Sequence, residues 1–216
     1  MLILIAGEKG GSGKSTIAVN LGIERAKRKY RVLVIDGDPQ QTAKNWLTRR
    51  QQFELRPEVP CLSMKSSEFH QEIAKLVDDY DDIVIDIAGR DSEEMRVALG
   101  FVDAVIFPVR PTMNDLETSG KMDALVGRFL EQETYLKKAL FVLSQASPNP
   151  FRKSTTKDAQ DYLSECGNID VSQSVISLRA AYEKASIEGA SISELMQKDH
   201  KAIKEFTQLY NEIFND

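Results

Sequence analysis

Short apolar runs alternate along the chain with longer stretches in which apolar residues recur every three or four positions. Runs of about four to eight apolar residues match strands that are buried on both faces. The stretches between them are long enough for helices that connect parallel strands. The pattern therefore predicts an α/β fold with a mostly parallel, twisted sheet of about seven strands flanked by helices. The predicted strands are residues 2–6, 31–35, 59–64, 82–88, 102–109, 138–143 and 171–176.

The amphipathic stretches between these runs predict the helices. The first begins at Ser15, and residues 40–56 form the second, with Trp46 and Leu47 facing inward. Pro108 is expected to end the strand in which it lies, and Asp115 is expected to cap the helix that continues through 116–130. Further helices are expected at residues 67–79, within 151–166, at about 179–187 and at 199–214.

Length and composition fit one globular domain, residues 1–216. The chain is 42% hydrophobic and 28% charged, without a linker, internal repeat or low-complexity tract. Its net charge of −5 argues against a protein coated in positive charge. Cys61 and Cys166 form no CxxC pair, as expected for incidental thiols in a reduced cytoplasmic protein. No signal peptide is evident, and no run approaches the ~18 apolar residues of a membrane span.

A glycine-rich segment, residues 7–13, separates the first predicted strand from the first helix. Strand, loop and helix in this order are the context of a phosphate-binding loop, in which backbone N–H groups and the helix N-terminus surround an anion. Lys14 would reach the β- and γ-phosphates, Ser15 would hold Mg²⁺, and Thr16 would bond the α-phosphate. The predicted site for ATP and Mg²⁺ consists of Gly10, Gly11, Ser12, Gly13, Lys14, Ser15 and Thr16.

Glu8 stands where a usual phosphate-binding loop has its first glycine, and Lys9 precedes two glycines. The resulting KGGSGKST segment resembles the deviant Walker A motif of the ParA/MinD superfamily of P-loop NTPases. The resemblance implies that Lys9 reaches across a dimer interface to the nucleotide of the partner subunit. It therefore implies a homodimer that forms on ATP binding, with Lys9 and Lys14 both catalytic. Cluster-ligating cysteines are missing, which argues against the nitrogenase iron protein branch.

Aspartates follow the predicted strands at the edge where open α/β sheets bind ligands. Asp86 ends an apolar run in the manner of a Walker B strand and is expected to hold Mg²⁺ with Ser15. Asp36 and Asp38 lie in a DGDPQ segment that resembles the DxDPQ box of ParA proteins. That resemblance implies that Asp38 positions or activates the attacking water and that Asp36 supports the Mg²⁺ shell.

Other segments resemble the family less closely. Asn149 and Pro150 resemble the adenine-side contacts of these ATPases. Many members carry prolines after the Walker B aspartate, whereas this chain continues AGRD. Arg90 is left open between a nucleotide or partner contact and a surface ion pair, and Asp91 or Ser92 is expected to cap the following helix.

The resemblance covers essentially the full chain and is closest to small, plasmid-type ParA proteins without an N-terminal helix-turn-helix. It implies a cytoplasmic, nucleoid-associated partition ATPase whose dimer binds DNA non-specifically and segregates plasmid or chromosomal DNA. Its slow ATP hydrolysis would be stimulated by a ParB-like centromere-binding partner. Lysines and arginines would supply the phosphate contacts. The candidates are Arg152, Lys153, Lys157, Arg179 and Lys184.

Two other functions of a nucleotide-binding protein are also considered, membrane binding and the modification of a small molecule. A MinD-like ATPase would bind a membrane through residues 201–216, in which Ile203, Phe206, Leu209, Tyr210 and Ile213 share one face. That tail ends in Asp216 and lacks a basic flank, so a helix packed on the domain is the simpler interpretation. A metabolic P-loop enzyme would need a second substrate pocket, for which no segment is left over. His70 and His200 have no partner cluster and are not predicted to bind metal.

Overall fold

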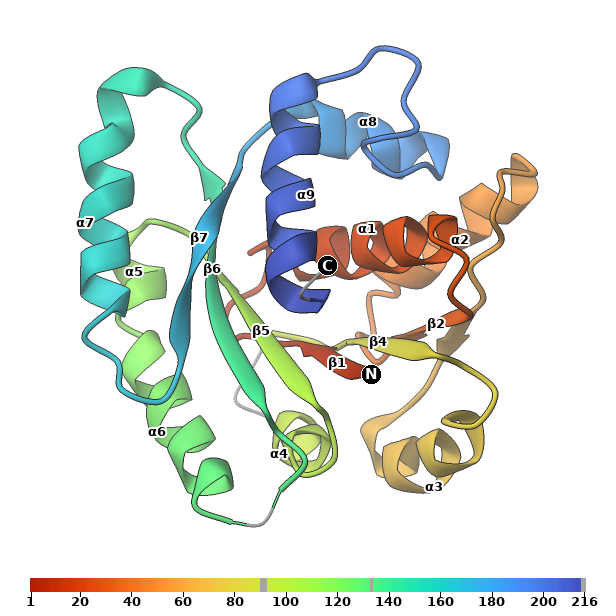
Figure 1. Cartoon of the computed structure of the whole chain (residues 1–216), viewed down its shortest axis with the longest axis horizontal. Coiled ribbons are helices and arrows are strands. Elements are labelled where there is room, and N and C mark those ends of the chain that lie inside the picture. Colours follow the sequence, from red (N-terminus) through yellow and green to blue (C-terminus); the bar gives the residue numbers. More distant parts are fainter. Residues whose placement is uncertain (90–92, 133, 215–216) are drawn as a thin grey trace.

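The protein was analysed as a computed structural model that describes residues 1–89, 93–132 and 134–214, without the side chains of Ser66, Ser67, His70, Glu94, Pro150 and Lys153. A seven-stranded sheet forms its centre, in the order β3-β2-β4-β1-β5-β6-β7 (Figure 1). All neighbouring strands run parallel, which confirms the predicted fold class. The strands are β1 (Leu2–Ile5), β2 (Val32–Asp36), β3 (Cys61–Ser63), β4 (Asp82–Asp86), β5 (Ala104–Val109), β6 (Lys138–Ala146) and β7 (Asp170–Ser177).

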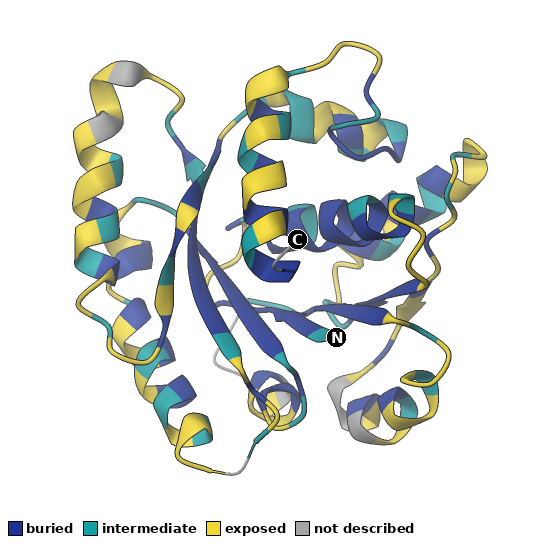
Figure 2. Ribbon diagram, in the orientation of Figure 1, coloured by how far each residue is buried: buried dark blue, intermediate teal, exposed yellow. Residues whose placement is uncertain are grey.

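Helices cover both faces of the sheet. On one face lie α1 (Lys14–Lys27), α2 (Thr42–Gln52), α8 (Ala180–Glu188) and α9 (His200–Phe214). The other face carries α3 (Ser66–Leu76), α4 (Glu93–Leu99), α5 (Met113–Leu116), α6 (Ser119–Leu130) and α7 (Lys153–Leu163), which follows the short 3-10 helix η1 (Pro150–Arg152). The central strands are buried along their length, whereas α7 and α9 show exposed outer faces (Figure 2).

The strands divide their side chains between two cores. Ile3 and Ile5 of β1 join the core under α1 and α9, while Leu4 joins the core under α4 and α6. This alternation follows from the two-residue period of a strand. Because apolar residues occupy both sets of positions, the runs read from the sequence were continuous rather than alternating.

The order of the strands places the candidate site. The strand β1 lies between β4 and β5, so the chain leaves β1 toward one half of the sheet and later returns to fill the other. Ligands of open α/β sheets bind at the carboxyl ends of strands where the order reverses in this way. The glycine-rich loop after β1 and Asp86 at the end of β4 meet at that point.

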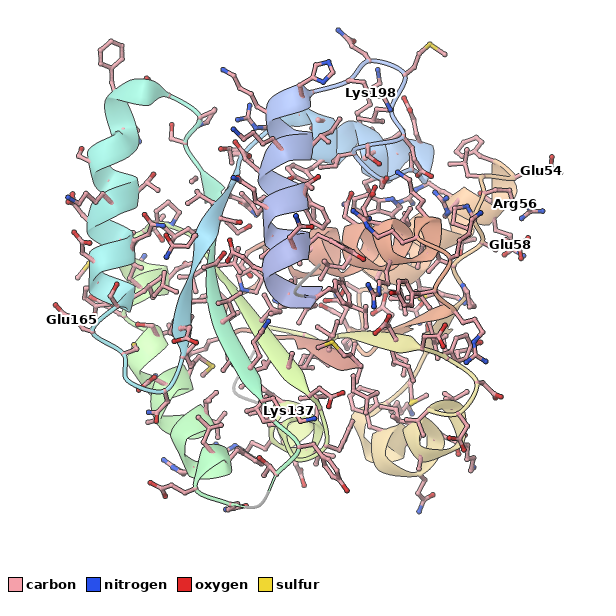
Figure 3. The ribbon with its side chains drawn as sticks, in the orientation of Figure 1. Glu54, Arg56, Glu58, Lys137, Glu165 and Lys198 are labelled. Carbon is pink, nitrogen blue, oxygen red and sulfur yellow. The ribbon has the colours of Figure 1, made fainter. Side chains whose placement is uncertain are left out.

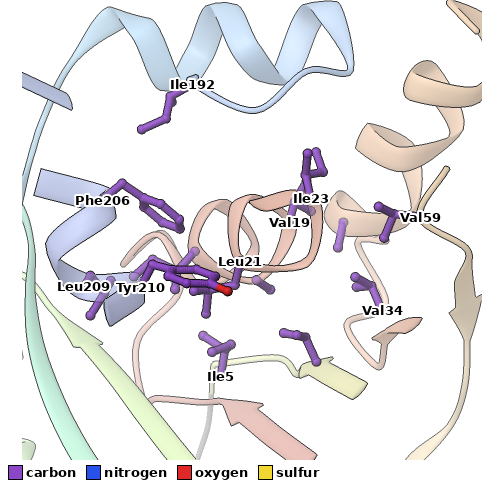
Figure 4. Close-up of a cluster of buried hydrophobic side chains, with 14 of the residues drawn as sticks. Ile5, Val19, Leu21, Ile23, Val34, Val59, Ile192, Phe206, Leu209 and Tyr210 are labelled. Atoms are coloured by element: carbon purple, nitrogen blue, oxygen red, sulfur yellow. The ribbon is translucent and has the colours of Figure 1, made fainter. Parts of the chain in front are cut away.

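The helix α9 closes the core beside β7 and over α1. Phe206, Leu209 and Tyr210 are at most 2% exposed (Figure 4). The Arg25 guanidinium donates to the Tyr210 hydroxyl at 2.9 Å and to the Asp82 carboxylate at 2.7 Å. The predicted C-terminal helix is thus confirmed as a packed element. No helix in the described part of the chain is long and apolar enough to cross a membrane.

Some local predictions were wrong. The stretch 116–130 is not one helix, because α5 ends at Leu116 and α6 starts at Ser119. The expected end of the strand at Pro108 is confirmed, because β5 ends one residue later, at Val109. Asp115 does not cap a helix N-terminus, because its carboxylate instead accepts hydrogen bonds from Nε and Nη2 of Arg110, at 2.8 and 3.0 Å. Arg90, Asp91 and Ser92 lie outside the described residues.

Gly189, which ends α8, provides a test of the packing between α8 and α2. Its φ is +65°, and a Cβ there would lie 2.3 Å from the Arg50 backbone nitrogen. Gly189→Ala should therefore lower the free energy of unfolding by about 3 kcal/mol, measured by urea denaturation. Gly120→Ala is the control, since a Cβ in this part of α6 meets nothing within 4 Å and alanine favours a helix. Equal effects of the two substitutions would contradict this account.

Candidate nucleotide site

The loop after β1 needs glycine at two positions. Gly11 has a φ of +72° and Gly13 a φ of +94°, in the left-handed region that side chains avoid. Gly13 is also the N-cap of α1, and it has no side chain that could accept the first N–H groups of the helix. The first turn of α1 carries no acidic residue. The first N–H groups of α1 are therefore available to an anion, as a phosphate-binding loop requires.

The loop after β4 presses against this glycine-rich loop. A Cβ on Gly89 would lie 2.4 Å from the Lys9 carbonyl oxygen and 2.7 Å from Lys14 Nζ. Only glycine fits here, because the nearest atom belongs to the backbone. The Lys14 ammonium donates to the same Lys9 carbonyl at 2.9 Å. The lysine predicted to reach the β- and γ-phosphates thus lies in the mouth of the loop.

Asp86 is the most confined acidic group of the site. It is 0% exposed, and neither of its carboxylate oxygens has a hydrogen-bond partner among the described residues. Burial raises the pKa of Asp86 to about 7, the neighbouring Ser15 hydroxyl opposes that rise, and Asp36 adds to it. A buried, unpartnered carboxylate beside a serine hydroxyl fits a divalent cation, which prefers oxygen ligands. The donor set therefore fits Mg²⁺.

Asp36 has a different environment. Its Oδ1 accepts the Asp38 backbone N–H at 3.0 Å, and its Oδ2 accepts the Lys44 backbone N–H at 2.8 Å. Burial raises the pKa of Asp36, although these backbone donors oppose the rise. The carboxylate ties the end of β2 to the first turn of α2, so it orders the loop that carries Asp38.

Asp38 faces the buried lysine. Burial lowers the pKa of Lys14, and the negative charges of Asp86 and Asp38 oppose that shift. The Asp38 side chain is half-buried, and its Oδ1 accepts the Gln40 backbone N–H at 2.8 Å. Lys14, Asp38 and Asp86 are thus brought to one place, as the sequence predicted.

Lys9 differs from Lys14 in its surroundings. It is exposed, and its amine has no hydrogen-bond or ion-pair partner among the residues that the structure describes. Glu8, next to it, lies 3.6 Å from Lys121, and its other carboxylate oxygen is buried without a partner in the described chain. The two lysines of the loop therefore point to different tasks, one inside the site and one at its surface.

A cleft of about 630 Å³ opens beside Gly13 and Thr16, between α1, α2 and α8. Its position next to the α-phosphate end of the loop suits a nucleoside. The sequence did not point to its walls, except through the rule that ligands bind at the carboxyl ends of strands. The main wall residues are Thr42, Trp46, Ser144, Gln145, Ser177, Leu178, Arg179, Tyr182 and Ile187.

Gln145 joins the cleft to the phosphate loop. Its side-chain amide donates to the Gly11 carbonyl, and its φ is +55°, which is unusual for a glutamine. Asn149, predicted as an adenine contact, is not among the described residues that line this cleft, and the side chain of Pro150, predicted with it, lies outside the described ones. The Asn149 Oδ1 instead accepts the Phe151 backbone N–H at 3.0 Å, which shapes the start of η1.

The residues predicted to bind DNA lie in two separate regions, one at η1 and α7 and the other at and just before α8. Arg152 and Lys157 are exposed on η1 and α7, and Lys153 begins α7. Lys184 is exposed on α8, 3.9 Å from Glu188. Figure 1 shows α7 and α8 well apart, so one subunit does not bring all of these charges together.

Arg179 is not a free cation. Its side chain is only 14% exposed, with Nη2 2.6 Å from Glu205 Oε1 and Nη1 3.6 Å from Asp199 Oδ2. The hydrogen bond to Glu205 is the main cause of a raised Arg179 pKa. Since two carboxylates already neutralise it, Arg179 does not match the unpaired charge expected of a DNA contact. No group of three or more His, Cys, Asp or Glu side chains that could hold a metal ion occurs among the described residues.

Comparison with known proteins identifies the relatives of this chain. The family model described as the CobQ/CobB/MinD/ParA nucleotide binding domain matches residues 3–192. Maintenance of carboxysome distribution protein A from Halothiobacillus neapolitanus is 28% identical over 98% of this chain and 95% of its own length. Protein ParA from Rhizobium radiobacter is 30% identical over 53% of this chain and 50% of its own. The cell division ATPase MinD of Pyrococcus furiosus, 20% identical, superposes with a TM-score of 0.77 over 99% of this chain and 98% of its own.

The Asp86 carboxylate predicts a pH dependence of stability. Its folded pKa of about 7 lies above its unfolded value, so the folded state binds the extra proton between these two values. Without metal or nucleotide, stability should fall as pH rises from about 4 to about 7, by up to about 4 kcal/mol from this group. The Asp86→Asn variant should not show this part of the loss of stability with rising pH, measured by urea denaturation in the presence of EDTA. Parallel pH profiles for the two proteins would contradict the assignment.

Proposed function

The chain belongs to the CobQ/CobB/MinD/ParA nucleotide-binding family, and we propose that this small ParA-type ATPase is a positioning switch. In this proposal ATP joins two copies of the chain, and the dimer binds DNA without sequence preference. Hydrolysis then separates the two copies and releases the DNA. The observation that carries the proposal is the contrast between the two loop lysines. Lys14 is buried in its own site, whereas Lys9 lies exposed with no side-chain partner among the described residues.

The site residues divide the work of hydrolysis. The backbone from Gly10 to Thr16 would cradle the phosphates, with Lys14 at the β- and γ-phosphates. Ser15 and Asp86 would hold Mg²⁺, which neutralises charge on the phosphate oxygens. Asp38, held by the loop that Asp36 orders, would orient the attacking water. Phosphoryl transfer depends on such positioning more than on covalent chemistry.

Lys9 would complete the nucleotide site of a second copy of the chain. A cation at the surface of a nucleotide loop can neutralise the triphosphate of a facing copy, and a two-fold arrangement makes this contact twice. ADP lacks the γ-phosphate that the facing lysine would bind, so hydrolysis weakens the dimer. No arginine in the described part of the site reaches Lys14 or Asp86, so slow turnover alone and stimulation by a partner are expected.

The cargo is proposed from chemistry and relatives together. Exposed Arg152 and Lys157, with Lys153 between them, offer the positive charge that binds DNA phosphates. Plasmid or chromosomal DNA marked by a ParB-like protein is the first candidate cargo. The carboxysome-distribution relative matches nearly the whole chain, which favours a protein body moved over the nucleoid as a second candidate.

A MinD-like membrane switch fits the structure less well. The apolar side of α9 contacts the core rather than solvent, with Phe206, Leu209, Tyr210 and Ile213 at most 2% exposed (Figure 4). An interfacial helix needs an apolar face free to enter the lipid. Membrane binding through α9 would therefore require the helix to leave the core.

The Lys9 assignment predicts a separation of binding from dimerisation. Lys9→Ala should abolish the ATP-dependent dimer in sedimentation velocity while ATP binding by the monomer stays within a few-fold of wild type. Lys14→Ala is the matched control, since it removes the lysine that serves the subunit's own nucleotide and should lose both properties. A Lys9→Ala protein that dimerises with ATP as wild type does would refute the proposal.

The DNA assignment predicts a charge-dependent loss on one surface. Arg152→Glu with Lys157→Glu should weaken ATP-dependent binding to a non-specific duplex by tenfold or more and reduce its salt dependence, measured by fluorescence anisotropy. The control is Lys75→Glu with Lys137→Glu, which changes charge equally at exposed sites far from α7; Figure 3 labels Lys137 at the amino end of β6. Equal losses in both double variants would show that only net charge matters.

A further inference from the structure

We propose that Glu205, on the C-terminal helix α9, is a positioning residue for the nucleoside side of the cleft. The inference rests on the proposed nucleotide site and adds a residue that does not itself line the cleft. Glu205 holds two residues of the cleft wall, Ser177 and Arg179, in place. Its role is to keep the wall in the form that receives the nucleoside.

Four donors converge on the Glu205 carboxylate. The Ser177 backbone N–H and hydroxyl donate to Oε2 and Oε1, each at 3.0 Å. Arg179 donates from Nε to Oε2 at 3.2 Å and from Nη2 to Oε1 at 2.6 Å. A carboxylate engaged in this way accepts charge-assisted bonds on both oxygens and fixes the groups that donate them.

The residues it holds form a continuous part of the cleft wall. Ser177, Leu178, Arg179 and Ala180 all line the cleft. The Leu178 backbone N–H donates to the Ala146 carbonyl at 2.8 Å, so the segment is tied to β6 on one side and to α9 on the other. Asp199, just before α9, adds a second contact to Arg179 at 3.6 Å.

Loss of Glu205 would free this segment. The Ser177 N–H and the Arg179 guanidinium would lose their shared acceptor, and part of the order of the wall would have to be established when a nucleoside binds. Ordering a binding surface at the moment of binding reduces affinity. The cost falls on the nucleoside side of the ligand, because the phosphate loop is built from other residues and does not contact Glu205.

Glu212 provides a matched control on the same helix. It accepts the Ser172 hydroxyl at 2.7 Å, the Gln173 backbone N–H at 3.1 Å and the Ser174 hydroxyl. Both glutamates thus tie α9 to β7 through carboxylates that accept backbone N–H and serine hydroxyl groups, and Glu205 accepts the Arg179 guanidinium in addition. The partners of Glu212 do not line the cleft, so its loss should affect stability alone.

The test compares ATP with inorganic tripolyphosphate, each with Mg²⁺, by isothermal titration calorimetry on the full chain. Glu205→Gln should weaken ATP binding about tenfold, leave tripolyphosphate binding within twofold of wild type, and lower Tm no more than Glu212→Gln does. Glu212→Gln should bind both ligands as wild type does. Glu205→Asp keeps the charge and should restore part of the ATP affinity, and it also serves if Glu205→Gln does not fold.

Three results would overturn the inference alone, and a fourth would overturn the proposed function as well. Equal loss of ATP affinity in Glu205→Gln and Glu212→Gln would mean that only general stability matters. Equal loss of ATP and tripolyphosphate would place the effect on the phosphate loop. Unchanged ATP affinity in both Glu205 variants would remove the positioning role while leaving the proposed function intact. A wild-type protein that binds neither ligand would overturn the proposed function itself, and this inference with it.

Discussion

The constraint on which the proposed nucleotide site depends is a pair of buried charged groups whose electrostatic requirements the folded chain does not meet by itself. Asp86 lies at 0% exposure without a hydrogen-bond partner among the described residues, and the ammonium of Lys14 is buried near it. Buried charge is costly unless it is paired, so such a site is stabilised by a ligand that supplies the missing charges. A divalent cation would supply positive charge to the carboxylate, and phosphates would supply negative charge to the ammonium. The close approach of Gly89 to the glycine-rich loop leaves no room for a side chain to fill the gap instead.

The surrounding elements are tied to this site by polar contacts. Asp36 connects the end of β2 to the start of α2, and Gln145 connects the end of β6 to Gly11. Glu205 connects α9 to the loop after β7. The Asp36 and Glu205 contacts each join a helix to the end of a strand, and the Gln145 contact joins a strand to the glycine-rich loop.

The fold and the phosphate loop could be predicted because their signals are local. Buried parallel strands read as apolar runs, and the loop from Gly7 to Lys14 is specified by consecutive residues. The cleft beside Gly13 and Thr16 could not be predicted, because its walls come from segments far apart in the chain. Asn149 stays a predicted adenine contact; its side chain accepts the Phe151 backbone N–H, a local contact that the sequence did not indicate. Arg179 looked free because its partner Glu205 lies 26 residues later.

The most direct test of the account is the number of protons released when Mg-ADP binds at pH 7, obtained by calorimetry in buffers of different ionisation enthalpy. Under the proposed function, Mg-ADP binds the site without promoting dimerisation. If Asp86 is ionised by the bound cation, wild type should release about half a proton per site, and Asp86→Asn should release none. Binding heats that do not depend on the buffer in wild type would contradict the claim that the buried carboxylate receives the metal.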